Sequence, residues 1–370
     1  MELVQHPREV RVLHGHQDAQ NLFLEAYNAG RLPHAWLITG PQGIGKATLA
    51  HRIARFLLSR VENDDAETGQ GGLFGEEEAP KIDVTSLDVD LDSAAIQRAI
   101  LGNHGGLFTL EVEQGGASKE IRVDDVRGLE HSLALSSAES SWRVVIIDSA
   151  DEMNRNAANA LLKSLEEPPE RVVFLLVSHC PGRLLPTIRS RCRVLRLMPL
   201  QNEVEEVLIS GGISPLDVGG ADIQFAILAA QGAPGRALRL HHAQAESYYQ
   251  KIVTLLQDLP SLQVRAVQKF SEEIAGDAVR WDVAMYMLRF LLYRTVLQAA
   301  AGGKNIKNIA KDNTELVTGE FALISQLLEH YSVEKISDIW EKTGTVTIQV
   351  SAVNMDKKLA FSTVISEFTA

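Results

Sequence analysis

The residues with the clearest chemical meaning form a glycine-rich segment that ends in a lysine. Residues 40–46 read Gly-Pro-Gln-Gly-Ile-Gly-Lys, with a short apolar run before them at 36–39 and a helical pattern after them at 49–57. In this strand–loop–helix context, glycines let backbone N–H groups approach phosphate oxygens, while the lysine reaches the outer phosphates. We therefore predict a nucleotide-binding loop rather than a glycine turn that only links a strand to a helix. The predicted contacts are Gly40, Gly43, Gly45 and Lys46.

This loop lacks one residue that metal-dependent nucleotide chemistry normally uses. Position 47, where Ser or Thr usually supplies a hydroxyl to Mg²⁺, is alanine. Thr48 comes next and belongs to the predicted nucleotide site, but one step along a helix turns a side chain by about 100°. Thr48 is therefore a poor substitute as the metal ligand.

A second element of the predicted site is an apolar run that ends in an aspartate. Residues 144–148 read Val-Val-Ile-Ile-Asp, the Walker B pattern, which places Asp148 near the metal. In ATPases of the AAA+ type a glutamate usually follows and polarises the attacking water. Here Ser149 follows, and a hydroxyl without an adjacent base is a poor general base. Because Asp151 and Glu152 are expected to begin the next helix and to point elsewhere, we predict weak or absent ATP hydrolysis by the chain itself.

The elements that must position these residues alternate between strands and helices up to about residue 199. Continuous apolar runs at 36–39, 144–147 and 172–177 are typical of parallel strands that helices cover on both faces. A helix is predicted over 154–167, where Pro168 and Pro169 end it. Further along, 121–123 looks like a strand end, and 126–133 has a helical period. These patterns predict an α/β P-loop core with a parallel sheet.

After residue 199 the strand signal almost disappears and the 3.6-residue period dominates. We predict three domains: a core at 1–199, a small helical domain at 200–242 and an all-α domain at 245–370. The most apolar stretch, 281–300, contains charged residues and is a better soluble helix than a membrane span.

Composition narrows the class of protein. The chain has 370 residues with 36 Lys+Arg against 48 Asp+Glu, a net charge of −12, which argues against coating nucleic acid through net charge alone. Its 2 cysteines exclude a disulfide framework, and the N-terminus has no signal-peptide pattern. The acid-rich stretch 62–92 is interpreted as a solvated insertion; a metal site is the alternative, which its irregular carboxylate spacing supports poorly.

Three segments together resemble the bacterial clamp-loader AAA+ proteins. They are 34–46, which contains the phosphate loop; 159–169, which reads Asn-Ala-Leu-Leu-Lys-Ser-Leu-Glu-Glu-Pro-Pro; and 185–192, which ends in Ser-Arg-Cys. The resemblance spans about residues 10–240 and implies an AAA+ core, a small helical lid and an all-α collar that assembles a five-subunit ring. The motor subunit of this family, gamma/tau, normally has an intact GK[ST] and a DE pair. Since this chain has neither, it resembles the rigid stator rather than the motor.

The resemblance assigns roles to three further residues. Arg191 matches the arginine finger, which would reach the γ-phosphate of ATP on a neighbouring motor subunit, and a planar, always charged guanidinium suits that task. Ser178 matches the sensor-1 position, and Arg236 matches sensor-2. The implied cofactor is ATP or ADP, with Mg²⁺ left open. Zinc is not implied, because no cysteine precedes Cys180.

The implied partners are the motor (gamma/tau) and delta subunits, with the sliding clamp and primer–template DNA engaged through the complex. The expected setting is cytoplasmic and away from membranes. The chain would belong to a DNA polymerase holoenzyme without a polymerase site of its own. Two other functions stay open: an active clamp-loader ATPase, restored by Thr48 and a relocated acid, and a stand-alone AAA+ DNA-binding regulator.

Several single residues have competing interpretations. The arginines near Arg191 could contact DNA, although solvated or interface positions fit them better. Cys192 reads as a packing residue rather than a reactive thiol. His14 and His16 lack a third metal ligand nearby in sequence. Ser149 with Asp151 is not expected to form a hydrolase dyad, because no base is assigned within its reach.

Overall fold

The structure is a computed structural model, and it falls into two compact units, each of which we describe by itself. The first unit comprises Met1–Ile213 with Gly232–Gly235, and the second comprises Ser214–Gln231 with Arg236–Ala370. The residues that the structure describes are 6–60, 83–112, 120–135, 142–200, 203–300, 314–353 and 355–369. The predicted insertion at 62–92 lies largely outside them. Its described end, 83–92, is tied to the core by an ion pair of 2.6 Å between Asp88 and Arg52.

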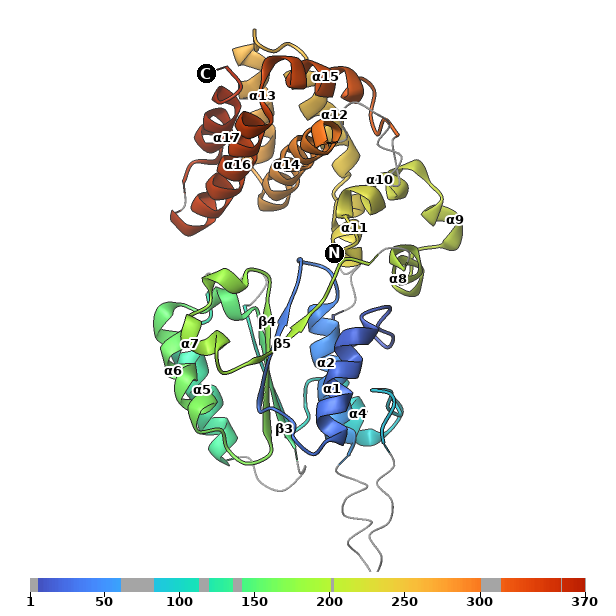
Figure 1. The fold of residues 1–370 in the computed structure, drawn as a ribbon, viewed down its shortest axis with the longest axis vertical. Coiled ribbons are helices and arrows are strands. Elements are labelled where there is room, and N and C mark those ends of the chain that lie inside the picture. The colour runs from blue at the N-terminus through green and yellow to red at the C-terminus, as the bar shows by residue number, and fades with distance from the viewer. Residues whose placement is uncertain are drawn as a thin grey trace, which may run out of the picture. The chain divides into compact units, whose positions relative to one another are not determined.

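A five-stranded parallel sheet forms the centre of the first unit (Figure 1). Its strands are β1 (Ala35–Thr39), β2 (Leu107–Glu111), β3 (Arg143–Asp148), β4 (Val172–Ser178) and β5 (Arg193–Arg196). Their order across the sheet is β2-β3-β4-β1-β5, and every neighbouring pair is parallel. The predicted α/β core with a parallel sheet is therefore confirmed. The central strands β1 and β4 are buried along their whole length, as their uninterrupted apolar runs predicted.

Helices cover both faces of this sheet. In Figure 1, α1, α2 and α4 lie on one side of the sheet, and α5, α6 and α7 lie on the other. The bounds are α1 Gln17–Asn28, α2 Lys46–Ser59, α4 Ala94–Ile100, α5 Val123–Leu135, α6 Arg155–Glu166, α7 Pro186–Arg189 and α8 Val204–Ser210, with 3₁₀ turns at Ala150–Glu152 and Pro181–Arg183. One apolar cluster, centred on Phe23, Trp36 and Phe56, fills the first side. Another, centred on Leu129, Leu161 and Phe174, fills the second.

Local sequence signals account for the bounds of α6, which carries the Leu-Glu-Glu-Pro-Pro motif. Asn154 caps its first turn, because its side-chain oxygen accepts a hydrogen bond of 2.9 Å from Ala157 N–H. The helix ends at Glu166, just before Pro168 and Pro169, which cannot continue it. The predicted strand end at 121–123 is wrong, however: Ile121 forms only an isolated bridge, and Val123 begins α5.

The described residues of the second unit form helices joined by turns and loops, with no strand among them. Its helices are α9 Pro215–Val218, α10 Ala221–Ala230, α11 Pro234–His242 (which contains the boundary between the units), α12 Ala245–Leu256, α13 Val264–Ala275, α14 Ala278–Ala300, α15 Glu320–His330, α16 Val333–Val353 and α17 Lys357–Ser366. The long helix α14 packs against α12, α13, α15 and α16 and supplies many of the buried side chains. The change to helical sequence after residue 199 is therefore confirmed. The division of this part into domains at 200–242 and 245–370 stays a prediction.

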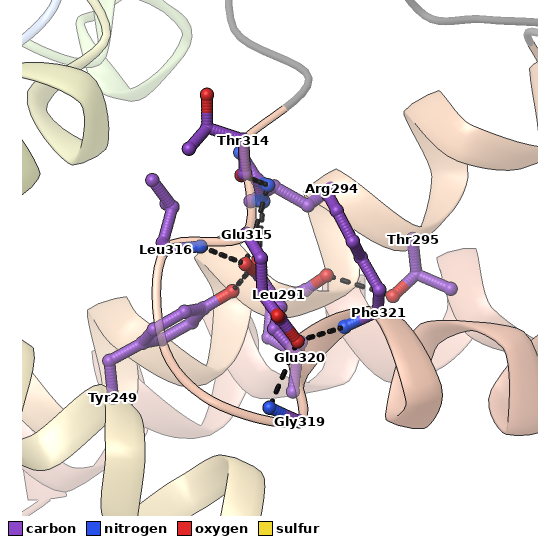
Figure 2. A network of polar contacts seen from close by, with 10 residues as sticks. All are labelled: Tyr249, Leu291, Arg294, Thr295, Thr314, Glu315, Leu316, Gly319, Glu320 and Phe321. Carbon is purple, nitrogen blue, oxygen red and sulfur yellow. Dashed lines mark hydrogen bonds and ion pairs between the residues drawn. The ribbon is translucent and has the colours of Figure 1, made fainter.

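A buried carboxylate joins three segments of the second unit. Glu320, at the start of α15, is fully buried and forms an ion pair of 2.5 Å with Arg294 of α14. Tyr249 of α12 donates a hydrogen bond of 2.6 Å to it, and Leu316 N–H donates another of 2.8 Å (Figure 2).

Among the described helices, none is long and apolar enough to cross a membrane, and this includes the apolar stretch in α14.

Candidate functional site

The phosphate loop connects the end of β1 to the start of α2, as the sequence predicted. Gly40, Gly43 and Gly45 all have positive φ angles, of 149°, 80° and 110°, which L-residues with side chains rarely adopt. At Gly40 space is also limiting, because a Cβ there would lie 2.7 Å from the backbone oxygen of Leu197. The glycines are therefore required by the path of the loop as well as by access of its N–H groups to a phosphate.

Lys46 is the first residue of α2, and its side chain turns back over the loop. It is 3% exposed, and its ammonium donates hydrogen bonds of 2.7 Å to the carbonyls of Gly40 and Pro41. These contacts place a fixed positive charge at the helix N-terminus, where anions are also favoured by the helix dipole. The structure thus brings together Gly40, Gly43, Gly45 and Lys46 in the geometry of a phosphate site.

Two contacts that the sequence did not predict brace this loop. Gly235 N–H donates a hydrogen bond of 2.8 Å to the Gly43 carbonyl, and His16 Nε2 lies 2.9 Å from the Ile44 carbonyl. Since a carbonyl can only accept, His16 must carry its proton on Nε2. Burial lowers the pKa of His16, which keeps the ring neutral in this role. His16 directly precedes α1, and the sequence had suggested only a weak metal pair with His14 for it, not this contact.

Asp148 lies at the carboxyl end of β3, beside the loop. Burial raises its pKa, while the hydrogen bond from Ser149 and the positive charge of Lys46 act in the opposite direction. Glu111, the last residue of β2, is paired with Asp148 in the sheet register and raises that pKa further. The charge of Lys46 therefore reaches Asp148, whose surroundings disfavour its charged form, and its predicted place near a metal stays a prediction.

Ser149 takes part in a short hydrogen-bonded chain. Its hydroxyl donates to Asp148 Oδ1 over 3.2 Å and lies 3.0 Å from His179 Nε2. Because a hydroxyl has one proton, His179 must then donate to Ser149. The expectation that no base lies within reach of Ser149 is wrong, since His179 comes from the turn after β4. In this direction of bonding, however, the imidazole holds the hydroxyl rather than deprotonating it.

Asp151 and Glu152 also differ from the prediction. They do not begin the next helix but lie in the 3₁₀ turn Ala150–Glu152, and Asp151 Oδ1 accepts a hydrogen bond of 3.0 Å from His179 N–H. Asp151 thereby ties the end of β4 to the end of β3. Burial is the main cause that raises the pKa of Glu152, and repulsion from the Asp151 carboxylate raises it further.

Ser178 lies on β4, the strand paired with β1, and Thr48 lies on α2 directly after the loop. Ser178 ends β4, pairs in register with Thr39 of β1 and is fully buried. Its hydroxyl has no hydrogen-bond partner among the residues that the structure describes. Thr48 is half-buried on the first turn of α2, next to Ala47. The Ser178 hydroxyl, at the predicted sensor-1 position, is therefore unsatisfied, whereas position 47 has no hydroxyl at all.

Arg191 follows α7 at the surface of the first unit. Its guanidinium forms an ion pair of 2.7 Å with Glu166 and donates a hydrogen bond of 2.9 Å to the Thr187 carbonyl. Its neighbour Cys192 is half-buried, and burial raises the pKa of that thiol to about 12, which supports a packing residue. Arg193 lies with its guanidinium 5.3 Å from the ring centre of Trp36.

Arg236 belongs to the second unit, and its contacts lie within that unit. Its guanidinium donates to Tyr286 Oη over 3.2 Å and to the Ala230 carbonyl over 3.3 Å, and it stacks 5.0 Å above the Tyr286 ring. Its sensor-2 role stays a prediction. Within the described ranges, no group of three or more His, Cys, Asp or Glu side chains is arranged to hold a metal ion, and this includes His14 and His16.

Comparison with known proteins gives one family match. The profile of the family described as "DNA polymerase III, delta subunit" matches residues 15–201, just over half of the chain. The chain is 35% identical over 233 residues to DNA polymerase III subunit delta' of Pseudomonas aeruginosa, covering 63% of this chain and 63% of that protein. It is 31% identical over 219 residues to subunit delta' of Escherichia coli, covering 58% and 56%. The matched regions thus span less than two thirds of these relatives.

More distant similarities extend to other subunits. Subunit tau of Escherichia coli is 31% identical over 193 residues, covering 52% of this chain and 26% of tau. Among solved structures, a gamma subunit-related protein of Thermotoga maritima has a TM-score of 0.38 and 18% identity, covering 94% of this chain and 98% of that one. A TM-score this low supports no further conclusion.

Proposed function

The chain belongs to the DNA polymerase III delta subunit family, and on that basis we propose that it is the delta-prime, or stator, subunit of a clamp loader. In this role it packs beside a motor subunit and helps to load the sliding clamp onto primed DNA. Two of its relatives carry the name delta'. The partners are the motor and delta subunits, with the clamp and the primer–template engaged through the assembled complex.

The proposal rests on one contrast. The chain lacks two of the residues that ATP hydrolysis normally uses, but it retains the complete arginine-finger motif. Position 47 has no hydroxyl for Mg²⁺, and Ser149 replaces the carboxylate that activates water. The Ser149 hydroxyl is also engaged by Asp148 and His179. The chain's own ATP turnover is therefore weak or absent.

The phosphate loop fits a nucleotide better than it fits a metal. Positive φ angles at three glycines, the buried Lys46 and the unsatisfied Ser178 hydroxyl all suit phosphate oxygens. ATP or ADP is therefore the proposed ligand, held by Gly40, Gly43, Gly45, Lys46, Thr48, Asp148 and Ser178, and the sensor-2 role of Arg236 stays a separate prediction. The Mg²⁺ ion would lack its usual hydroxyl ligand at position 47. Its own contribution would be to screen the phosphate charge.

Arg191 is the residue proposed to act on a neighbour. Its guanidinium is partly exposed and carries a planar set of donors that match phosphate oxygens. Supplied in trans, an arginine of this kind stabilises the negative charge that develops during phosphoryl transfer and is worth on the order of 10³–10⁵ in rate. Turnover at the adjoining motor site would then depend on this chain.

The test measures ATP turnover by a complex reconstituted from this chain, the motor and delta subunits, the clamp and primed DNA. We expect Arg191→Ala to abolish the share of turnover that belongs to the adjoining site, while the complex still assembles. Arg189→Ala removes an exposed arginine two residues earlier and is the matched control. An unchanged rate with Arg191→Ala would reject the finger role.

The two alternative functions have their own readouts. An active ATPase would show steady turnover by the isolated chain that Lys46→Ala abolishes. A stand-alone DNA-binding regulator would bind DNA tightly without the other subunits. Calorimetry of ATP and ADP binding, with and without Mg²⁺, measures whether Ala47 removes metal dependence or binding altogether.

A further inference from the structure

A carboxylate on a different element holds the guanidinium of Arg191. Glu166 Oε1 lies 2.7 Å from Arg191 Nη2, while the Thr187 carbonyl accepts a hydrogen bond of 2.9 Å from Nη1. The two acceptors come from α6 and α7, and each binds a different terminal nitrogen of the planar Arg191 guanidinium. The guanidinium therefore has a defined orientation before any partner arrives.

The position of Glu166 is itself fixed by the core. It is the last residue of α6, and the preceding Leu165 is 1% exposed within the apolar cluster on that side of the sheet. Glu166 itself is about half exposed. Its carboxylate thus projects from an anchored helix end toward Arg191, without being buried.

We propose that Glu166 is a positioning residue that orients Arg191 toward the triphosphate of the neighbouring motor subunit, an inference that rests on the function proposed above. Because both side chains are partly exposed, their pairing adds little net stability. The main effect of the Glu166–Arg191 pair is instead to restrict the conformations of the long, flexible Arg191 side chain. Arginine has five N–H donors, so the contacts to Glu166 and Thr187 leave donors for phosphate oxygens.

Orientation matters at this position because the finger acts only when it is correctly placed. A displacement of about 1 Å from the productive geometry can cost roughly 10² in rate. Competition between Glu166 and the phosphate for the guanidinium is weak, since the pair is screened by water while a triphosphate carries more charge. Removal of Glu166 is therefore expected to lower the turnover of the partner rather than to raise it.

The experiment uses the reconstituted complex with ATP, the clamp and primed DNA. In Glu166→Ala, the part of kcat that depends on Arg191 should fall roughly tenfold, with KM for ATP unchanged. Glu166→Ser, whose side chain is too short to reach, should behave in the same way. Glu166→Gln keeps an acceptor oxygen at this position and should retain most of the rate. Glu167→Ala removes the exposed neighbouring acid and should match wild type.

A double-mutant cycle separates positioning from a general structural role. If Glu166 acts through Arg191, Glu166→Ala should have no further effect on kcat in an Arg191→Ala background. An equal fall in both backgrounds, a rise in kcat, or wild-type turnover in Glu166→Ala would overturn the positioning role and leave the finger intact. Wild-type turnover in Arg191→Ala alone would instead reject the function proposed above. Gel filtration of each complex checks that assembly is retained.

Discussion

Replacement of Glu320 by alanine should lower the free energy of unfolding of the second unit far more than replacement of a nearby surface residue. The carboxylate is fully buried and meets Arg294, the Tyr249 hydroxyl and Leu316 N–H (Figure 2). Breaking a buried ion pair by removing one partner costs about 3–5 kcal/mol, because it leaves the other charge uncompensated. In a unit of this size, that loss lowers the melting temperature by on the order of 10 °C.

The same perturbation should open the segment around α15 locally. Glu320 joins the loop at 314–316 to α12 and α14, so its loss removes the polar contacts that hold this segment down. A loss of about 3 kcal/mol or more corresponds to roughly 10²-fold faster amide exchange where the exchange rate follows the opening equilibrium. Hydrogen exchange measured by mass spectrometry on peptides from 314–330 reports this directly.

Two further variants make the result interpretable. Glu329→Ala changes an exposed acid on the same helix and should stay within about 0.5 kcal/mol of wild type in urea unfolding. Glu320→Gln keeps the shape but leaves Arg294 without a counter-charge, so it should fall between the two. The reasoning would be refuted if Glu320→Ala cost less than about 1 kcal/mol, or if it resembled Glu329→Ala in exchange.

Three other outcomes follow from the first unit. Gly235→Ala places a Cβ 3.1 Å from a phosphate-loop carbonyl and should cost about 1–3 kcal/mol in urea unfolding, whereas Gly182→Ala, with open space around it, should not. Burial lowers the pKa of His51 to about 3, so on acidification the imidazole is protonated in the unfolded chain before it is protonated in the folded chain. The free energy of unfolding should therefore fall by up to about 1.4 kcal/mol per pH unit as pH drops below about 6.5. In urea unfolding curves, His51→Gln should reduce that dependence on pH. In iodoacetamide labelling of the folded chain at pH 8, exposed Cys180 should react, while Cys192 should react only after unfolding.

The sequence predicted those elements whose burial leaves a continuous apolar run. Strands β1, β3 and β4 are central in the sheet and read as such, and α2 and α6 have clear helical periods. Strands β2 and β5 escaped prediction because they lie at the sheet edges, where part of each strand is exposed and the pattern is mixed.

In the candidate site, the sequence predicted the residues of the motif but not the residues that tertiary structure brings to it. Glycines and Lys46 follow a motif with fixed spacing, so local sequence suffices to place them. His179, Gly235 and Glu166 contact groups that lie 25 or more residues away from them in the chain. The register of β3 against β4 brings His179 there, the approach of 232–235 to the loop brings Gly235, and the packing of α6 against α7 brings Glu166 close to Arg191. No spacing rule could have identified those contacts.

The phosphate loop has a structural role that does not require hydrolysis. Its carbonyls are bound by Lys46, by Gly235 N–H and by the neutral ring of His16, so one loop joins β1, α2, the segment 232–235 and the chain before α1. Each of these contacts uses loop backbone or Lys46 and none uses a hydroxyl at position 47 or a carboxylate at position 149. Loss of those two groups therefore removes catalytic chemistry while it leaves the junction intact. That separation fits the stator role proposed above, in which the chain would hold Arg191 in a fixed position and would not need a hydrolytic cycle of its own.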